Sequence, residues 1–267
     1  MGNAANAPEE EAPTVAPATP TPYYYPFQLQ YHGGATISGA TQYNIYLGCA
    51  ASNGSCWGNP STFEYNLDNS SFIALASQYV GGSPTGKYPP SGTWCYNNSA
   101  VGSYLAYSDI VAWMNACYNA LGQHGGAGVF YHIFLNQGID TCMADGVNCY
   151  SPDGKHGSFT FCGYHTYTTI GGAPVFFTVE PYQTVNGCYG NGSNIINATA
   201  NVLSHETFEL ITDPALDAWY GVLFNNTASA EIGDICNFVL FTFPVNSVDY
   251  TIQLEYSNTY SACTVSS

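Results

Sequence analysis

The sequence predicts a single α/β (α+β) domain with a mixed sheet, stabilised by disulfides and preceded by an extended N-terminal arm. The chain has 267 residues, enough to bury a sizeable core. Apolar runs typical of strands are mixed with two substantial helix-like segments, no internal repeat is evident, and ten cysteines are present. We therefore expect one core rather than two, with residues 27–267 forming the domain.

The arm comprises residues 1–26, which are mostly Ala, Pro, Thr and Glu. This segment has no hydrophobic period, so it cannot bury a core and is expected to be extended or similar to polyproline II. Its Thr-Pro content also suits O-glycosylation. The arm would serve either as a flexible stalk or as a segment docked on another copy of the protein. Residues 23–27 (YYYPF) offer an aromatic anchor for such docking.

Four segments of the domain are expected to be strands. Residues 41–47 and 128–135 form the first two, and the second is nearly all apolar or aromatic, as expected of a buried central strand. Residues 238–243 and 250–256 flank a Pro-Val-Asn-Ser segment and predict a closing hairpin.

Two helices are expected between these strands. Ser108 and Asp109 would cap the first, whose apolar side continues to Leu121 and which ends at Gly122. Residues 194–212 predict the second, which is long and apolar on one side and is followed by a proline at position 214. This second helix carries the motif discussed below.

The charge of the chain excludes several partners. Lys87 and Lys155 are the only basic side chains, and the formal net charge is -16. Such a protein cannot neutralise phosphates, so nucleic acid and anionic membrane surfaces are excluded as partners. The sequence also lacks a run of about 18 apolar residues, so no membrane span is expected.

The cysteines indicate an extracellular protein. Their number is even and none forms a C-x-x-C pair, so disulfides are expected rather than a zinc ribbon or a thioredoxin-like site, with free buried thiols as the alternative. The polar N-terminus has no signal-peptide h-region. The chain is therefore expected to be a processed form or one whose start lies upstream. Local disulfides are expected between Cys49 and Cys56 and between Cys142 and Cys149, and a Cys236–Cys263 bond would tie the last segment back to the core.

Glycosylation provides a second reason to expect a secreted protein. Charged residues make up only 7% of the chain, so something other than charge is expected to keep its surface in solution. The chain carries six N-x-Ser/Thr sequons, at Asn53, Asn69, Asn97, Asn191, Asn197 and Asn225. We expect glycans at these positions.

Residues 202–214 carry the strongest chemical signal. His205 and Glu209 lie four residues apart and project from the same face of a helix. Glu206 stands beside them, where zinc hydrolases place a general base. The arrangement is H-E-x-x-H with its second histidine replaced by glutamate. It predicts a metal site with His205 and Glu209 as ligands and Glu206 as the candidate catalytic residue.

A third ligand must come from outside this helix. Glu231 and Asp234 are the candidates because Cys236 indicates that their segment packs close to the helix. One of them would ligate the ion and the other would orient a ligating side chain, in either order. Asp213 and His165 are further candidates, although His165 is also typical of a hydrogen-bonded core histidine.

The ligand set affects the chemistry of the site. A His/Glu/Glu set places two negative charges on a divalent ion and lowers its Lewis acidity, which weakens hydrolysis. Oxygen-rich ligation also shifts preference from zinc toward calcium or manganese. We expect a divalent ion, zinc or calcium. A metal-free hydrogen-bonded cluster and a solvated helix face are the alternatives.

Several short motifs follow one another in a fixed order along the domain. They are residues 31–34 (YHGG), 129–134 (VFYHIF), 162–167 (CGYHTY) with 171–172 (GG), 204–209 (SHETFE), 212–214 (TDP) with 218–219 (AW), and 231–236 (EIGDIC). In this order they resemble the EXORDIUM/phosphate-induced protein family, in particular its microbial branch. The resemblance spans residues 28–260 and implies a secreted, cell-wall or extracellular protein with a zincin-like core. It implies no established reaction, and residues 1–26 lie outside it.

Two functions are therefore expected. In the first, the protein is a glycosylated extracellular structural protein that assembles head to tail into filaments through residues 1–27, with a degenerate zincin-like metal site. In the second, it is a secreted metallohydrolase, a peptidase, in which Glu206 acts as the base toward the attacking water. Low charge, many sequons and the glutamate at position 209 favour the structural function.

Overall fold

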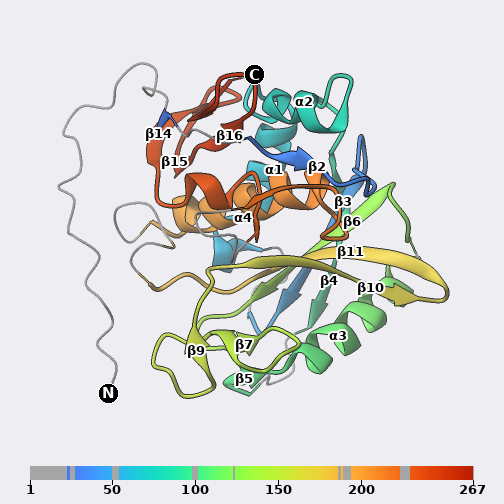
Figure 1. Cartoon of the computed structure of the whole chain (residues 1–267). Helices are drawn as coiled ribbons and strands as arrows, with labels where there is room; N and C mark the ends of the chain where they lie inside the picture. The colour runs from blue at the N-terminus through green and yellow to red at the C-terminus, as the bar shows by residue number, and fades with distance from the viewer. Residues whose placement is uncertain are drawn as a thin grey trace.

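A five-stranded mixed sheet lies at the centre of the fold, in the order β10-β11-β6-β3-β4 (Figure 1). Strands β3, β4, β6 and β11 run parallel, and β10 pairs antiparallel with β11. The computed structural model describes residues 23–24, 28–49, 54–97, 102–122, 124–185, 188, 194–222 and 229–266. The strands are β3 (Thr41–Leu47), β4 (Pro90–Asn97), β6 (Val129–Leu135), β10 (Tyr164–Ile170) and β11 (Ala173–Glu180).

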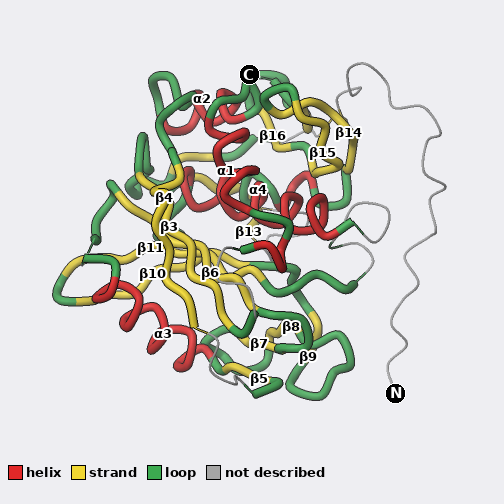
Figure 2. The backbone as a smooth tube through the Cα atoms, turned by 180° about the vertical axis from the view of Figure 1, so that it is seen from behind, coloured by secondary structure: helices red, strands yellow, loops and turns green. Residues whose placement is uncertain are grey.

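Helices cover both faces of this sheet (Figure 2). Because side chains alternate along a strand, Ile45 and Leu47 pack toward α3, whereas Tyr46 between them faces α4. The four α-helices of the described residues are α1 (Pro60–Asp68), α2 (Ser77–Val80), α3 (Tyr107–Ala120) and α4 (Ile195–Thr212), and the 3-10 turns are η1 (Ser55–Trp57), η2 (Ile73–Ala76) and η3 (Asp234–Cys236).

The sheet face toward α4 contains a line of buried polar side chains. His132 of β6 lies 2.8 Å from both the Gln42 Oε1 atom of β3 and the Thr178 Oγ1 atom of β11. Thr178 in turn lies 2.8 Å from Glu180 Oε1. Burial lowers the pKa of His132 to about 3, so its ring is neutral. Polar groups therefore cross the sheet beside the helix that carries the predicted motif.

Smaller sheets surround this core. β14 and β15 form an antiparallel hairpin against α4, and the N-terminal strand β1 pairs with β17 at the edge of the sheet β1-β17-β16. The strands are β1 (Tyr23–Tyr24), β2 (Gln30–Tyr31), β5 (Tyr104–Leu105), β7 (Asp140–Cys142), β8 (Asn148–Tyr150), β9 (Ser158–Phe159), β12 (Trp219–Val222), β13 (Ser229–Ala230), β14 (Leu240–Val245), β15 (Val248–Gln253), β16 (Glu255–Ser257) and β17 (Ala262–Thr264).

The α/β fold class, the mixed sheet and the long helix are confirmed. The strand predicted over residues 41–47 matches β3, and the long helix begins one residue after its predicted start. The closing hairpin exists, but its turn was placed too early and too long. Asn246 and Ser247 alone form it, both with positive φ, and Pro244 lies within β14.

Five disulfides link all ten cysteines, and the three predicted pairs are among them. The other two are Cys95–Cys117, which ties β4 to α3, and Cys162–Cys188. This density of disulfides is typical of secreted proteins. None of the described helices combines the length and the apolar composition that a bilayer crossing requires.

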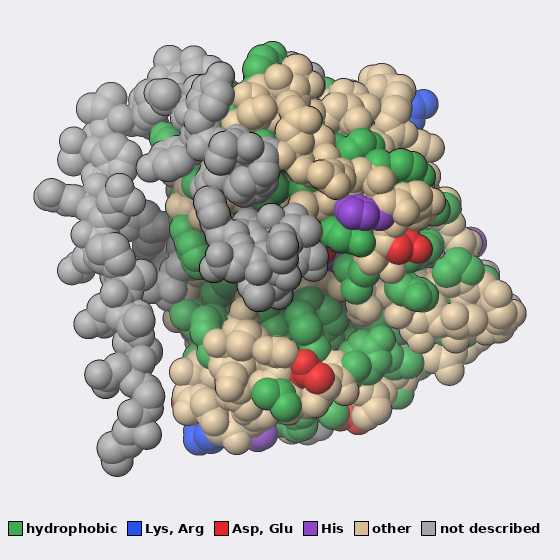
Figure 3. Space-filling model, in the orientation of Figure 1, with side chains coloured by type: hydrophobic (Ala, Val, Ile, Leu, Met, Phe, Trp, Pro, Cys, Tyr) green, Lys and Arg blue, Asp and Glu red, His purple; other side chains and the backbone are tan. Residues whose placement is uncertain are grey.

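The arm lies mostly outside the described residues. Its end is the exception, because Tyr23–Tyr24 form β1. The predicted boundary at residue 27 and the extended form of residues 1–22 stay predictions. The face drawn in Figure 3 carries few charged side chains, in keeping with the low content of charged residues.

Candidate metal centre

Helix α4 supplies three side chains to a buried acidic site. Its first turn is capped by the Asn194 Oδ1 atom, which accepts a hydrogen bond from Ile196 N at 3.0 Å. The helix then runs between the central sheet and β15 and is buried along most of its length. His205, Glu206 and Glu209 therefore project into protein rather than into bulk water, so the predicted solvated face is wrong.

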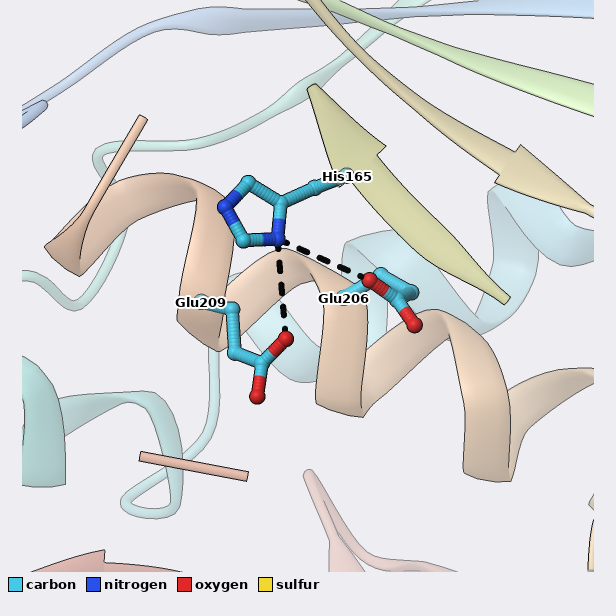
Figure 4. A group of neighbouring side chains, drawn as sticks. All are labelled: His165, Glu206 and Glu209. Atoms are coloured by element: carbon cyan, nitrogen blue, oxygen red, sulfur yellow. Dashed lines mark ion pairs between the residues drawn. The ribbon is translucent and has the colours of Figure 1, made fainter. Parts of the chain in front are cut away.

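The first cluster, which we call the inner group, consists of His165 from β10 with Glu206 and Glu209 (Figure 4). The His165 Nδ1 atom lies 3.7 Å from Glu206 Oε2 and 3.5 Å from Glu209 Oε2. These three side chains are only 3–5% exposed. One histidine nitrogen and two carboxylate oxygens thus converge in a closed interior site.

The other ring nitrogen of His165 fixes the orientation of the ring. Its Nε2 atom lies 3.1 Å from the backbone oxygen of Asp213 and 3.5 Å from Glu231 Oε1. The backbone oxygen can only accept, so Nε2 carries a hydrogen. In the neutral ring the lone pair then resides on Nδ1 and points at the two α4 carboxylates. Histidine ligands of metals usually have this kind of support.

The second cluster, the outer group, consists of His205, Glu209 and Asp234. The His205 Nε2 atom lies 3.1 Å from Glu209 Oε1 and 4.0 Å from Asp234 Oδ1. The Asp234 backbone N–H donates to the same Glu209 oxygen at 3.1 Å, and the Glu231 N–H donates to Asp234 Oδ2 at 3.2 Å. Glu209 is therefore common to both groups, with a different oxygen facing each histidine.

Gln253 of β15 constrains the tautomer of a neutral His205 ring. Its side-chain amide donates to Gly233 O at 2.8 Å and lies 3.0 Å from His205 Nδ1. If the amide donates in both directions, Nδ1 is an acceptor and the ring hydrogen is on Nε2, directed at Glu209. Coordination of a metal through Nε2 then requires the Gln253 amide to turn and present its oxygen to Nδ1.

A pocket of about 150 Å³ lies beside α4 next to the outer group. Of the inner group, only Glu206 contributes to its wall. The pocket is lined by Thr160, Phe161, Cys162, Gly163, Asn201, Val202, His205, Glu206, Asp234, Asn237, Phe238 and Gln253. Its wall thus combines carboxylates, amides and two aromatic rings and contains no lysine or arginine.

Two glycines permit the close packing around the site. A Cβ atom at Gly163 would lie 2.6 Å from Val202 Cγ1 and 3.0 Å from Glu206 Oε1. A Cβ atom at Gly233 would lie 2.6 Å from His205 Nδ1. These positions therefore hold glycine because the chain passes directly against functional side chains, and no other residue fits without a shift.

The electrostatics of the site are dominated by burial and by excess carboxylate. Burial disfavours a charged His165 ring, but Glu231, Glu206 and Glu209 outweigh it and raise its pKa well above the usual value. Burial likewise disfavours a charged His205 ring, but nearby carboxylates, above all Glu209, outweigh it and raise the pKa of His205. For Glu209, burial is outweighed by His205 and His165, which lower its pKa.

The remaining carboxylates lack sufficient counter-charge. Burial raises the pKa of Glu206 and, more strongly, those of Glu231 and Glu255. Within the described part of the chain, Glu206 Oε2, Glu231 Oε1 and both Glu255 oxygens are buried without a hydrogen-bond partner. Since no lysine or arginine lies in the site, either protons or a cation must neutralise these groups. Orphaned oxygens converging with a histidine nitrogen fit a divalent ion.

The structure brings together most of the predicted site residues. His205, Glu209 and Asp234 form one group, while Glu231 approaches His165 instead. Glu206, predicted as a base beside the ligands, also belongs to the inner group. His165, a further ligand candidate that is also typical of a hydrogen-bonded core histidine, lies in the inner group and is hydrogen-bonded to the backbone oxygen of Asp213. Gln253 and Glu255 were missed. Both lie in the predicted strand 250–256, and the sequence of a strand does not indicate which distant helix its buried polar side chains contact.

The sequons fall in three kinds of place. Asn69 is exposed just after α1, Asn97 is half-buried at the end of β4, and Asn197 lies in α4. The Asn197 Oδ1 atom accepts a hydrogen bond from Thr251 N at 3.2 Å. Asn53, Asn191 and Asn225 lie outside the described residues. Glycosylation of all six stays a prediction.

No protein-family model, curated protein or solved structure matches this chain. The resemblance to the EXORDIUM family stays a prediction based on the order of the motifs. Function is therefore argued from the site and from the fold.

Proposed function

We propose that the protein is a secreted, glycosylated structural protein that binds a divalent ion in the inner group and assembles through its N-terminal arm. The observation that carries this proposal is the closed character of the inner group. His165, Glu206 and Glu209 are almost fully buried, and His165 and Glu209 are not among the residues that line the pocket. An ion held there would stabilise the fold, as structural ions do.

The edge strand β1 supports the assembly part of the proposal. Tyr23 pairs with Cys263 and Tyr24 with Ala262, so the end of the arm adds a strand to β17. The same pairing made between two chains would join one copy to the next, and repetition of this contact gives a filament. Five disulfides support an extracellular location.

The test combines metal analysis with size determination. Elemental analysis of the native protein is expected to find zinc or calcium. Analytical ultracentrifugation is expected to show assemblies of the full chain and monomers of a variant lacking residues 1–26, with unchanged circular dichroism. Monomers of the full chain at all concentrations would contradict the assembly proposal, and metal-free native protein would contradict the ion.

The second candidate is a metallohydrolase, favoured by the pocket that His205, Glu206 and Asp234 share. When bound, a divalent ion there would supply Lewis-acid chemistry. Glu206, which lines the same pocket, would accept a proton from an attacking water there. A peptide-library screen with the wild type and Glu206→Gln tests this function, and cleavage that Glu206→Gln abolishes would favour it over the structural one.

A further inference from the structure

Glu209 presents one carboxylate oxygen to each of the two histidines. Its Oε2 atom lies 3.5 Å from His165 Nδ1, and its Oε1 atom lies 3.1 Å from His205 Nε2. We propose that Glu209 bridges two divalent-cation sites, an inner one with His165 and Glu206 and an outer one with His205 and Asp234. This inference rests on the metal site proposed above and adds a second ion to it.

The spacing of the donor atoms fits two ions. Ligands about 2.0–2.4 Å from one ion lie roughly 3.3–3.6 Å from one another in the tetrahedral and octahedral arrangements of zinc and calcium. The histidine-to-carboxylate distances are 3.5 and 3.7 Å in the inner group and 3.1 and 4.0 Å in the outer group. In each group the three donor atoms lie within 4.8 Å of one another. Small side-chain adjustments would bring the three donor atoms of either group to the spacing of ligands on one ion.

The charge of the site also favours a second ion. Glu206, Glu209, Glu231 and Asp234 lie around the two histidines, and the buried carboxylate of Glu255 also acts on His205. With both rings neutral and these acids ionised, their negative charge exceeds what one divalent ion balances. The Oε2 atom of Glu206 lies buried in the inner group and has no hydrogen-bond partner among the described residues. A single ion in the outer group would leave this oxygen without a partner.

The two sites differ in access. The inner side chains are 3–5% exposed, and the hydrogen on His165 Nε2 already leaves Nδ1 as the ligand atom. In the outer group Asp234 is 38% exposed and faces the pocket. Outer binding also requires the Gln253 amide to turn so that His205 Nε2 loses its hydrogen. The inner ion is therefore expected to exchange slowly, and the outer ion to bind more weakly and to exchange rapidly.

The test uses the full chain, stripped of metal and reloaded with Zn²⁺ alone. Elemental analysis after gel filtration in micromolar free Zn²⁺ is expected to find two ions per chain. Addition of EDTA should remove one ion within seconds and the other at least 100-fold more slowly. With Mn²⁺ instead of Zn²⁺, the fully loaded protein should give the spectrum of a coupled manganese pair in electron paramagnetic resonance.

Variants separate the sites. Asp234→Asn should lose the rapidly exchanging ion and keep the slow one. The fold should stay intact because the asparagine oxygen can still accept the hydrogen bond from the Glu231 N–H. His165→Ala should keep only the rapid one. Glu209→Gln should abolish the manganese coupling. Asp249→Asn, an exposed carboxylate on β15, is the matched control and should retain both ions.

The outcomes distinguish this inference from the proposed function. A single slowly exchanging ion that Asp234→Asn leaves unchanged would overturn the bridge while supporting the buried ion. Absence of any bound Zn²⁺ would overturn both. Two ions that are retained in Asp234→Asn, or that leave at the same rate, would also overturn the assignment of the outer site.

Discussion

Single glycines decide how closely the backbone approaches α4. Gly163 precedes β10, so it sits two residues before His165 in the chain and also touches Glu206 through space. Any side chain at this position would push the β10 end away from the helix. The distance between His165 and the α4 carboxylates is therefore set partly by a residue that has no side chain of its own.

The substitution Gly163→Ala tests this role. The added Cβ atom would meet Val202 Cγ1 at 2.6 Å, so we expect a loss of about 1–3 kcal/mol in the free energy of unfolding, from overpacking. Urea denaturation measures the change. Gly128→Ala is the matched control because a Cβ atom there meets nothing within 4 Å, and it should change stability by less than about 0.5 kcal/mol. Equal effects in the two variants would show that packing against α4 is not the cause.

A second residue-scale feature is the buried acid Glu64 of α1. The Asn44 side-chain amide donates to Glu64 Oε1 at 2.7 Å, whereas Glu64 Oε2 and Asn44 Oδ1 are both buried and have no partner among the residues that the structure describes. A proton on Glu64 removes the cost of burying an unpaired negative charge. Burial raises the pKa of Glu64 to about 8, so the group is protonated at neutral pH.

This protonation predicts a stability that falls as pH rises. The folded pKa of about 8 exceeds the ordinary value of 4.5, so the stabilising contribution of Glu64 is complete below pH 4.5 and is lost as pH rises through 8. The difference corresponds to about 5 kcal/mol at most. Urea denaturation between pH 4 and pH 9 should show this slope in the wild type. Glu64→Gln should reduce it, and an unchanged slope would refute the protonated form.

Among the elements, α4 matters most because it carries one histidine and two carboxylates of the site. Its N-terminus depends on Asn194, an exposed residue whose side chain caps the first turn. The next residues of the helix are held by the sheet and by β15. The cap is therefore the part of the helix that depends least on packing.

We expect Asn194→Ala to lower the free energy of unfolding by about 1 kcal/mol, because the Ile196 N–H loses its acceptor. Asn194→Ser, which retains a capping oxygen, should restore most of this loss. Chemical denaturation of the three proteins measures the effect. If the serine variant is as unstable as the alanine variant, the side chain does not act as a cap.

The elements that could be predicted from sequence are those with a strong local pattern. The sequence directly shows the apolar run of β6, the long amphipathic helix α4 and the closely spaced cysteine pairs. α1 was missed, because Pro60–Asp68 mixes polar and apolar residues without a clear period and begins after Asn59 in a left-handed conformation. The hairpin β10–β11 was missed because threonines in β10 interrupt the alternation of apolar and polar residues that is typical of a strand.

The site could be predicted only as far as one helix extends. His205, Glu206 and Glu209 are neighbours through helical geometry, which a sequence shows directly. The convergence of His165, Asp234 and Gln253 depends on three other segments that meet α4 through the fold. Sequence spacing contains no information about such contacts, and this is why the role of His165 could not be separated from that of a core histidine.

At the scale of the whole molecule, charge imbalance is the dominant feature. A net charge of -16 at pH 7, with only two basic side chains, gives self-repulsion throughout the folded chain. We expect the melting temperature at pH 7 to rise by roughly 2–5 °C between 10 and 200 mM NaCl, because salt screens this repulsion. Near pH 4, where many carboxyl groups are protonated, salt should have little effect. Differential scanning calorimetry measures both, and equal salt effects at the two pH values would contradict the explanation.

The pairing of β1 with β17 defines the route by which a pulling force on the N-terminal arm would reach the rest of the domain. β17 contains Cys263, which is bonded to Cys236 at the end of η3, and η3 begins at Asp234. In a filament joined through β1, tension on the arm would pass through the backbone of β17 into this covalent cross-link. The force would then reach the edge of the acidic pocket instead of separating β17 from the domain. The Cys236–Cys263 disulfide, which links the C-terminal segment to η3, would thus also hold each subunit to its neighbour.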